Sequence, residues 1–140
     1  MSEASSSPLP LREPAPEPAE AGRTSSPLLE ISNAIVALHK RHYGKGPTSA
    51  KTYMVGELVV VLLKGGYTQV ERTLYLEGLS EAVMVQRRAF QDAMQDRFRH
   101  VVEEATGREV VAVMSSNHLE PDLSCETFVL GDDAAADPTA

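Results

Sequence analysis

Cysteine, tryptophan and aromatic residues are scarce in this 140-residue chain. It has one cysteine, Cys125, and no tryptophan, and only 5% of its residues are aromatic. A single cysteine excludes an intramolecular disulfide, which is typical of proteins from a reducing compartment. The N-terminus lacks the basic and apolar stretches of a signal peptide, so we expect a cytoplasmic protein. With so few aromatic residues, the core must consist mainly of Val, Leu, Ile, Met and Ala.

Long apolar runs and an excess of positive charge are also missing. The longest strongly apolar run, residues 58–63, is far shorter than the roughly 20 residues of a spanning helix, so we expect no membrane crossing. The net charge is −7, and much of it comes from acids near the two ends of the chain. This balance argues against nucleic-acid binding, because phosphate contacts require a positive surface.

Composition divides the chain into one folded domain and two tails. Residues 1–27 contain six of the nine prolines, and Ser, Ala and Glu stand between them. Such a segment buries too little apolar surface to offset the entropy of ordering, so we predict a disordered tail. Residues 132–140 form a second, acidic tail that we also expect to be disordered. Residues 28–131 have the composition of a single domain.

Helix signals are clear at the start of this domain. Ser26 suits an N-cap and Pro27 suits the first helical position. Apolar residues then recur at steps of three and four up to a stop at Gly44, which predicts an amphipathic helix: Leu28, Ile31, Ile35 and Leu38. We expect His42 to extend this apolar face as a partly buried, hydrogen-bonded residue.

Two hairpins and a second helical region complete the prediction. Thr68 and Glu71 match a capping box, and a long helix is predicted from Ser80 to a stop at Gly107. Turn residues separate four β-prone segments: 51–55, 58–63, 109–115 and 124–130. The order α-β-β-α-β-β predicts a two-layer α+β fold, with a four-stranded antiparallel sheet and helices on one face.

A basic loop after the first helix is the leading candidate site. No acid occurs between Glu30 and Glu57, whereas four bases do: Lys40, Arg41, Lys45 and Lys51. Backbone N–H groups of a glycine-containing loop can point together at an anion. We predict anion or partner binding through this loop, with an ordinary solvated turn as the alternative. The predicted binding residues are Lys45, Gly46, Thr48 and Lys51.

Arg87 is a further member of the predicted binding set. It falls on the apolar face of the long helix, beside Val83, Phe90 and Met94. A buried charge requires a partner, for which Glu57 is one candidate. The alternative is that this face is a subunit or ligand interface, and a homodimer through the long helix is expected on that basis.

His118 and Asp122 are secondary candidates in the turn of the last hairpin. An imidazole and a carboxylate can move a proton or contact a divalent cation. Plain turn chemistry is the alternative. No second His or Cys stands nearby at metal-ligand spacing, so we predict neither a metal site nor a cofactor.

Several segments together resemble one bacterial family. They include ISNAIVALHKRHYGKGPTSAKTY from residue 31, LVVVLLKG from residue 58, RRAF from residue 87 and ATGREVVAVMSSNHLEPDLSCETFVL from residue 105. This pattern is similar to the MpsC-like family, named for a Na⁺-translocating membrane potential-generating system, over about residues 28–131. The resemblance implies a soluble accessory protein beside membrane subunits that move ions or inorganic carbon. It implies a transport-system protein as the partner, and it supplies no catalytic residue that could be carried over to this chain.

Three functional hypotheses are consistent with these residues. The leading one is an accessory or regulatory binding module, not an enzyme, that is peripheral to a membrane transport system and takes a small anion in its basic loop. The alternative is a small enzyme that uses His118 and Asp122 with an anion cradle around Lys45. A nucleic-acid-binding regulator is the third and is disfavoured by the acidic balance.

Overall fold

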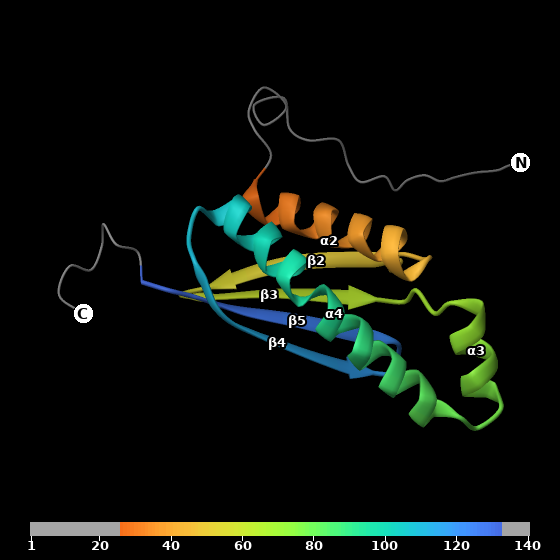
Figure 1. Cartoon of the computed structure of the whole chain (residues 1–140). Coiled ribbons are helices and arrows are strands. Elements are labelled where there is room, and N and C mark those ends of the chain that lie inside the picture. The colour runs from red at the N-terminus through yellow and green to blue at the C-terminus, as the bar shows by residue number, and fades with distance from the viewer. Residues whose placement is uncertain (1–25, 133–140) are drawn as a thin grey trace, which may run out of the picture.

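The computed structural model describes residues 26–132 (Figure 1). The tails predicted for residues 1–27 and 132–140 lie outside this range, apart from Ser26, Pro27 and Asp132. The described elements are α2 (Pro27–Tyr43), β2 (Ser49–Val55), β3 (Leu58–Lys64), α3 (Gln69–Leu76), α4 (Ser80–Thr106), β4 (Val110–His118) and β5 (Leu123–Leu130). The predicted α+β class is confirmed.

The four strands form one antiparallel sheet in the order β2-β3-β5-β4. The predicted four-stranded antiparallel sheet is therefore confirmed. In the middle of the sheet, Val61 of β3 pairs with Thr52 of β2 on one side and with Glu126 of β5 on the other. The second hairpin lies against the first through the β3–β5 pairing, so β2 and β4 are the edge strands.

Local capping signals position the helices as the sequence predicts. The Ser26 hydroxyl accepts hydrogen bonds from the N–H groups of Leu28 and Leu29, and Gly44 ends α2 in the left-handed region at φ +94°. Thr68 and Glu71 form the predicted capping box of α3. The prediction for His42 is wrong, because its side chain is exposed. His39, four residues after Ile35, occupies the inner face instead and contacts the rings of Phe90 and Phe98.

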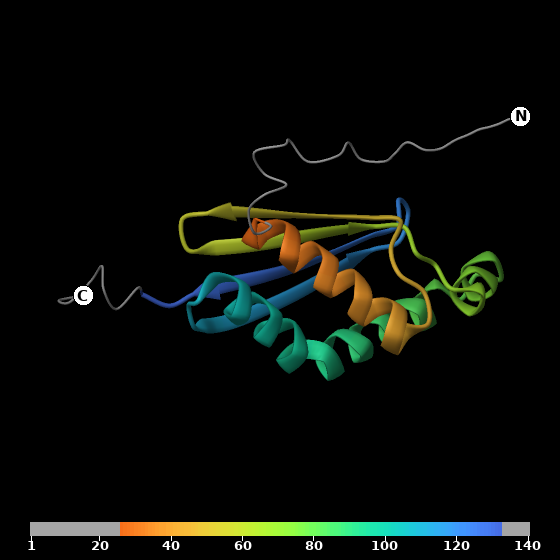
Figure 2. The ribbon, with the colours of Figure 1, turned by 90° about the horizontal axis from the view of Figure 1, so that it is seen from above.

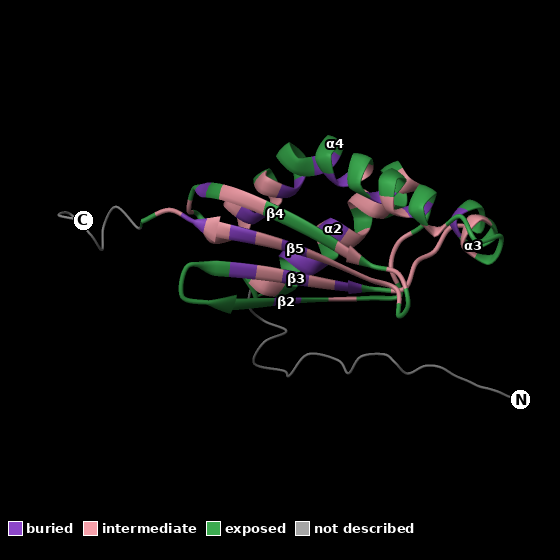
Figure 3. Ribbon diagram, turned by 90° about the horizontal axis from the view of Figure 1, so that it is seen from below, coloured by how far each residue is buried: buried purple, intermediate pink, exposed green. Residues whose placement is uncertain are grey.

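Two helices and the sheet form the two layers of the domain. Figure 2 shows α2 and α4 on the same side of the sheet, while α3 lies beyond its end. The buried residues of Figure 3 line the space between these layers. Full burial of one large aliphatic or aromatic side chain contributes about 1.5–3 kcal/mol. The apolar cluster includes Ile31, Ile35, Val59, Val61, Phe98, Val102, Phe128 and Leu130.

The apolar face of α4 is used inside the domain. Val83, Met94 and Phe98 are buried against the rest of the chain. A homodimer through this face, as the sequence suggested, therefore has no free surface to use. Although α4 spans 27 residues, no helix within the described range is both long and apolar enough to cross a membrane.

Candidate functional site

A buried ion cluster around Arg87 lies at the end of the interior that is nearest to α3. The Arg87 guanidinium donates through Nε to Glu71 Oε2 at 2.8 Å and through Nη2 to Glu71 Oε1 at 3.1 Å. Its Nη1 donates to Asp122 Oδ1 at 2.6 Å. The pairing with Glu71 is bidentate, which is the strong geometry for an arginine and a carboxylate. The partners are thus Glu71 and Asp122 instead of Glu57, which lies in the β2–β3 turn.

Neighbouring groups complete the cluster. The capping box of α3 gives Glu71 a further donor, because the Thr68 N–H bonds to Glu71 Oε1 at 3.0 Å. The Tyr43 hydroxyl, at the end of α2, also donates to Glu71. The guanidinium of Arg87 lies 4.8 Å from the centroid of the Tyr67 ring, within cation–π distance. The Glu71 carboxylate is therefore bound from α2, α3 and α4 together.

Titration of the cluster follows from these contacts. Burial alone would raise the pKa of Glu71, but the hydrogen bonds from Arg87, Tyr43 and Thr68 outweigh it and bring the pKa below its ordinary value of 4.5. Burial alone would lower the pKa of Arg87. The hydrogen bonds and charges of Glu71 and Asp122 outweigh this effect and raise the pKa above its ordinary value. Burial, helped by the bond to Glu71, raises the pKa of Tyr43 to about 12. At neutral pH Glu71 and Arg87 therefore stay ionised, and Tyr43 stays a donor.

A second polar group surrounds Glu126 on the inner face of β5. Glu126 is fully buried and accepts hydrogen bonds from Gln91 Nε2 at 2.9 Å and from the Ser115 hydroxyl. Gln91 Oε1 accepts from Asn117 Nδ2 at 2.8 Å, and Asn117 Oδ1 accepts from the Ser124 hydroxyl at 2.9 Å. Burial raises the pKa of Glu126 to about 7, and the two hydrogen bonds only partly oppose this effect. Its neighbours are neutral donors, in contrast to the arginine that faces Glu71.

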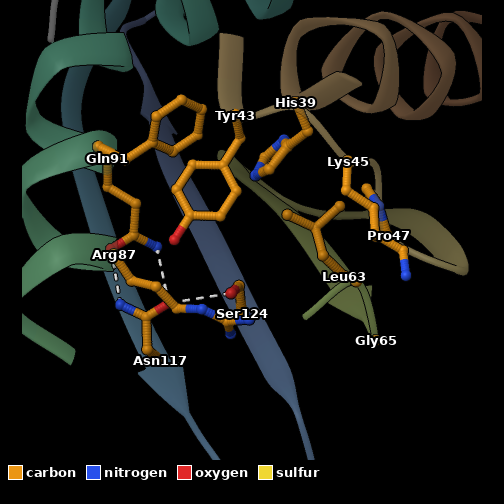
Figure 4. Close-up of a pocket in the computed structure, with 12 residues that line it drawn as sticks. His39, Tyr43, Lys45, Pro47, Leu63, Gly65, Arg87, Gln91, Asn117 and Ser124 are labelled. Atoms are coloured by element: carbon orange, nitrogen blue, oxygen red, sulfur yellow. Dashed lines mark hydrogen bonds between the residues drawn. The ribbon is translucent and has the colours of Figure 1, made fainter. Parts of the chain in front are cut away.

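A cavity of about 30 Å³ lies between these two polar groups (Figure 4). One water needs about 10–15 Å³ of this kind of volume, so the cavity has room for about two waters or one small ion. Figure 4 shows Tyr43 on one side and Gln91, Asn117 and Ser124 on another. Its polar lining residues are His39, Tyr43, Lys45, Arg87, Gln91, Asn117 and Ser124.

The basic loop closes one side of the cavity and lies close to Gly65 and Gly66. The Thr48 N–H and hydroxyl both donate to the Lys64 carbonyl, at 2.8 Å and 2.9 Å. Gly66 has φ +99°, and a Cβ there would lie 3.0 Å from Pro47 Cα. A side chain at this position would therefore displace the loop. Thr48 and Gly66 position the backbone near Lys45, and the Thr48 hydroxyl is used for this structural contact.

The structure separates the predicted site residues into two sets. Lys45 and Arg87 line the cavity, and Asp122 reaches it through its bond to Arg87. Lys51 instead projects from β2 beside the Tyr53 ring, on the sheet face away from the helices. His118 is exposed at the end of β4, where its Nδ1 bonds to the Pro121 carbonyl at 2.8 Å, and it does not line the cavity. The enzyme hypothesis needs His118 beside Lys45, and these residues are not brought together there.

Gly46 belongs to the structure of the loop. A Cβ at Gly46 would meet the aliphatic part of the Lys40 side chain at 2.8 Å.

Among residues 26–132, no carboxylate lies within 4.0 Å of the ammonium groups of Lys45 or Lys51. No group of three or more His, Cys, Asp or Glu in the same range could hold a metal ion. The loop thus contributes Lys45 to the lining of the cavity, and no described carboxylate pairs with its ammonium group.

Sequence reasoning missed the polar group around Glu126. The signal for it is the alternation of β5, because Phe128 and Leu130 point inward and Glu126 precedes them at the same spacing. A carboxylate at an inward position indicates a buried polar contact. Gln91 shows the same signal on α4, where it falls on the buried face beside Arg87 and Met94.

Comparison with known proteins identifies a family for the whole described domain. A family model described as "Na+-translocating membrane potential-generating system (MpsC)" matches residues 28–132. No curated protein and no solved structure matches the chain. The matched segment includes both polar groups and the cavity.

Proposed function

Because this chain belongs to the MpsC family, we propose that it serves a Na⁺-translocating membrane system as an accessory binding module. In this proposal its ligand is a small inorganic anion, held in the cavity beside Lys45. The observation that carries the proposal is Lys45 in the lining of a polar cavity, with no carboxylate from the described residues within 4.0 Å of its ammonium group. Membership in the family supplies the link to the membrane system.

Arg87 supplies the second part of the anion site. A guanidinium has five N–H donors. Three of these bond to Glu71 and Asp122. The other two have no acceptor among the described residues, and Arg87 lines the cavity. An anion between Lys45 and Arg87 would accept hydrogen bonds from both cations.

The charge balance of the site predicts weak binding. Two cations, Lys45 and Arg87, are matched by two carboxylates, Glu71 and Asp122. The field that an anion meets is therefore small, and we expect reversible binding in the millimolar range. Weak binding suits a module that follows the concentration of an abundant ion.

The size of the cavity limits the ligand to very small anions. Room for about two waters suits chloride or bicarbonate better than a larger tetrahedral anion such as sulfate. The apolar walls formed by Leu63 and Phe90 give no hydrogen bonds to a larger ligand. We therefore expect chloride or bicarbonate to bind better than sulfate.

A titration of the full chain tests the proposal, with backbone amide NMR shifts of Asn117 and Ser124 as the readout. We expect chloride or bicarbonate to shift these amides to saturation. The Lys45→Ala variant should weaken this binding by roughly tenfold, because it removes the uncompensated cation. The matched control is Lys51→Ala, which removes the same charge from the other face of the sheet and should leave binding unchanged.

Stability gives the second control. Both lysines are exposed, so each substitution should change the free energy of unfolding by less than about 0.5 kcal/mol. Equal weakening by the two variants would show a general effect of net charge. Either this result or the absence of saturable shifts at Asn117 and Ser124 would refute the anion site.

A further inference from the structure

The sheet has one face that no described element covers. Side chains alternate between the faces of a strand, and Thr52, Val61, Glu126 and Phe128 point toward the helices. Their neighbours in sequence point the other way, where Figure 2 shows neither α2 nor α4. We call this surface the open face. Its most exposed apolar residues are Val55 at 70%, Met114 at 54%, Tyr53 at 45% and Leu58 at 38%.

The strand register arranges the open face into rows that cross the sheet from β2 to β4. The first two rows are Val55-Leu58-Val129-Ala112 and Tyr53-Val60-Thr127-Met114. The next two are Lys51-Leu62-Cys125-Ser116 and Ser49-Lys64-Leu123-His118. The face is thus apolar at the end with the β2–β3 turn and becomes polar toward the other end. It contains no acidic residue in these rows.

We propose that a second copy of this chain covers the open face, in a twofold dimer with the sheets packed face to face. Twofold dimers are the commonest assembly, and their contacts pair one surface with itself. The twofold axis runs parallel to the strands, midway between the two packed sheets and over the boundary of β3 and β5. Each row then lies against the same row of the other copy. Apolar rows then meet apolar rows. This inference rests on the open face alone and is independent of the anion site.

The proposed symmetry brings complementary residues together. It places β3 against β5 of the other copy, and β2 against β4. Tyr53 then faces Met114 of the partner subunit, and Leu58 faces Val129 of the partner subunit. Lys51 faces Ser116 of the partner subunit, so no lysine of the face stands directly opposite another lysine. Aligned sheets pack about 30° apart, so the central pairs hold this register best.

The area of the open face is sufficient for a specific but modest interface. Strand spacing and rise make a four-stranded patch of seven-residue strands roughly 19 Å by 23 Å. Two such faces bury roughly 900 Å² in projection, which is close to the roughly 1,000 Å² lower limit of a biological interface. We therefore expect a dimer whose population rises with concentration.

Sedimentation of the full-length protein over a range of concentrations tests the dimer. We expect Tyr53→Glu and Met114→Lys each to raise the dissociation constant by roughly tenfold or more, because each places a charge in an apolar row. A mixture of the two variants should recover a heterodimer, since one of its two edge contacts becomes Glu opposite Lys and the other stays Tyr opposite Met. Chromatography of differently tagged chains detects that recovery.

The matched control is Val85→Glu, which places a charge on α4 at a residue of similar exposure, 53%. This variant should dimerise like the unmodified protein. A full-length chain that stays monomeric at millimolar concentration would overturn the proposal and leave the open face to a protein of the membrane system. Loss of the dimer in Val85→Glu, or no recovery in the mixture, would overturn it as well.

Discussion

The interior of this domain has an apolar end and a polar end, and the two are stabilised differently. At the apolar end Ile35, Phe98 and Leu130 are buried among other hydrocarbon side chains. At the polar end Arg87 and Glu71 are equally hidden from solvent but depend on specific partners. Hydrophobic contacts are non-directional, whereas a buried charge requires a donor or acceptor at a defined position. The apolar end can therefore adjust to small changes, and the polar end cannot.

The largest effect should come from removing the cation of the polar end. Arg87→Leu leaves the buried Glu71 and Asp122 carboxylates without their shared partner, so we expect a loss of about 3–5 kcal/mol in the free energy of unfolding. Urea denaturation at neutral pH measures it. The control is Arg88→Leu, at the exposed neighbouring position, which should change stability by less than about 0.5 kcal/mol. A small loss in Arg87→Leu would show that the cluster stabilises neither α3 nor the last hairpin.

Glu126 provides a test in which pH replaces mutation. Its pKa is raised from 4.5 to about 7, so the folded protein holds this proton more tightly than the unfolded chain does. The protonated Glu126 side chain therefore contributes its full share to the free energy of unfolding below pH 4.5, and this contribution is lost as the pH rises toward 7. The loss should be on the order of 1–3 kcal/mol. The contribution of Glu71 to stability has the opposite pH dependence. Its pKa is lowered in the folded protein, so this contribution is lost on acidification.

Glu126→Gln isolates this effect, because a glutamine of the same shape does not titrate. The difference in unfolding free energy between the variant and the unmodified protein should grow across the window from pH 4.5 to 7 in favour of the variant. Urea denaturation at both ends of the window gives the two differences. A difference that is independent of pH would show that Glu126 is ionised throughout.

The smallest effect is expected at the apolar end. Ile35→Val removes one buried methylene and should cost about 0.5–1.5 kcal/mol. Since no charge is involved, the loss should be the same at every pH at which the protein is folded. Thermal and urea unfolding at several pH values measure it. A pH-dependent loss would mean that the two ends are coupled through the shared helix α4.

The difference between the two ends also explains what could be predicted from the sequence. Helix limits follow from short-range signals such as Ser26, the Thr68–Glu71 pair and Gly107, and the structure agrees with them. The arginine on the apolar face of the long helix could be identified from the helical period. Its partners could not, because Glu71 and Asp122 lie 16 and 35 residues away and nothing local relates them to Arg87. Only the tertiary fold brings them together.

The candidate binding loop shows the same limit. Its lysines look equivalent in the sequence, but strand alternation places Lys51 on the open face while Lys45 remains beside the cavity. The cavity itself depends on Asn117 and Ser124 in the last hairpin, far from the loop in sequence. A list of basic residues therefore locates the loop without defining what it faces.

The long sequence separations within the Arg87 cluster also bear on the order of folding. Tyr43 and Glu71 are 28 residues apart, whereas at the apolar end Val110 bonds to Glu103 only seven residues away. Contacts between distant residues require closure of long loops, which is entropically costly early in folding. We therefore expect α4 and the β4–β5 hairpin to be structured in the transition state. The ion cluster would then form later, as would the β3–β5 pairing that joins Val61 to Glu126 across 65 residues, and it would hold α3 against α4 and the last hairpin.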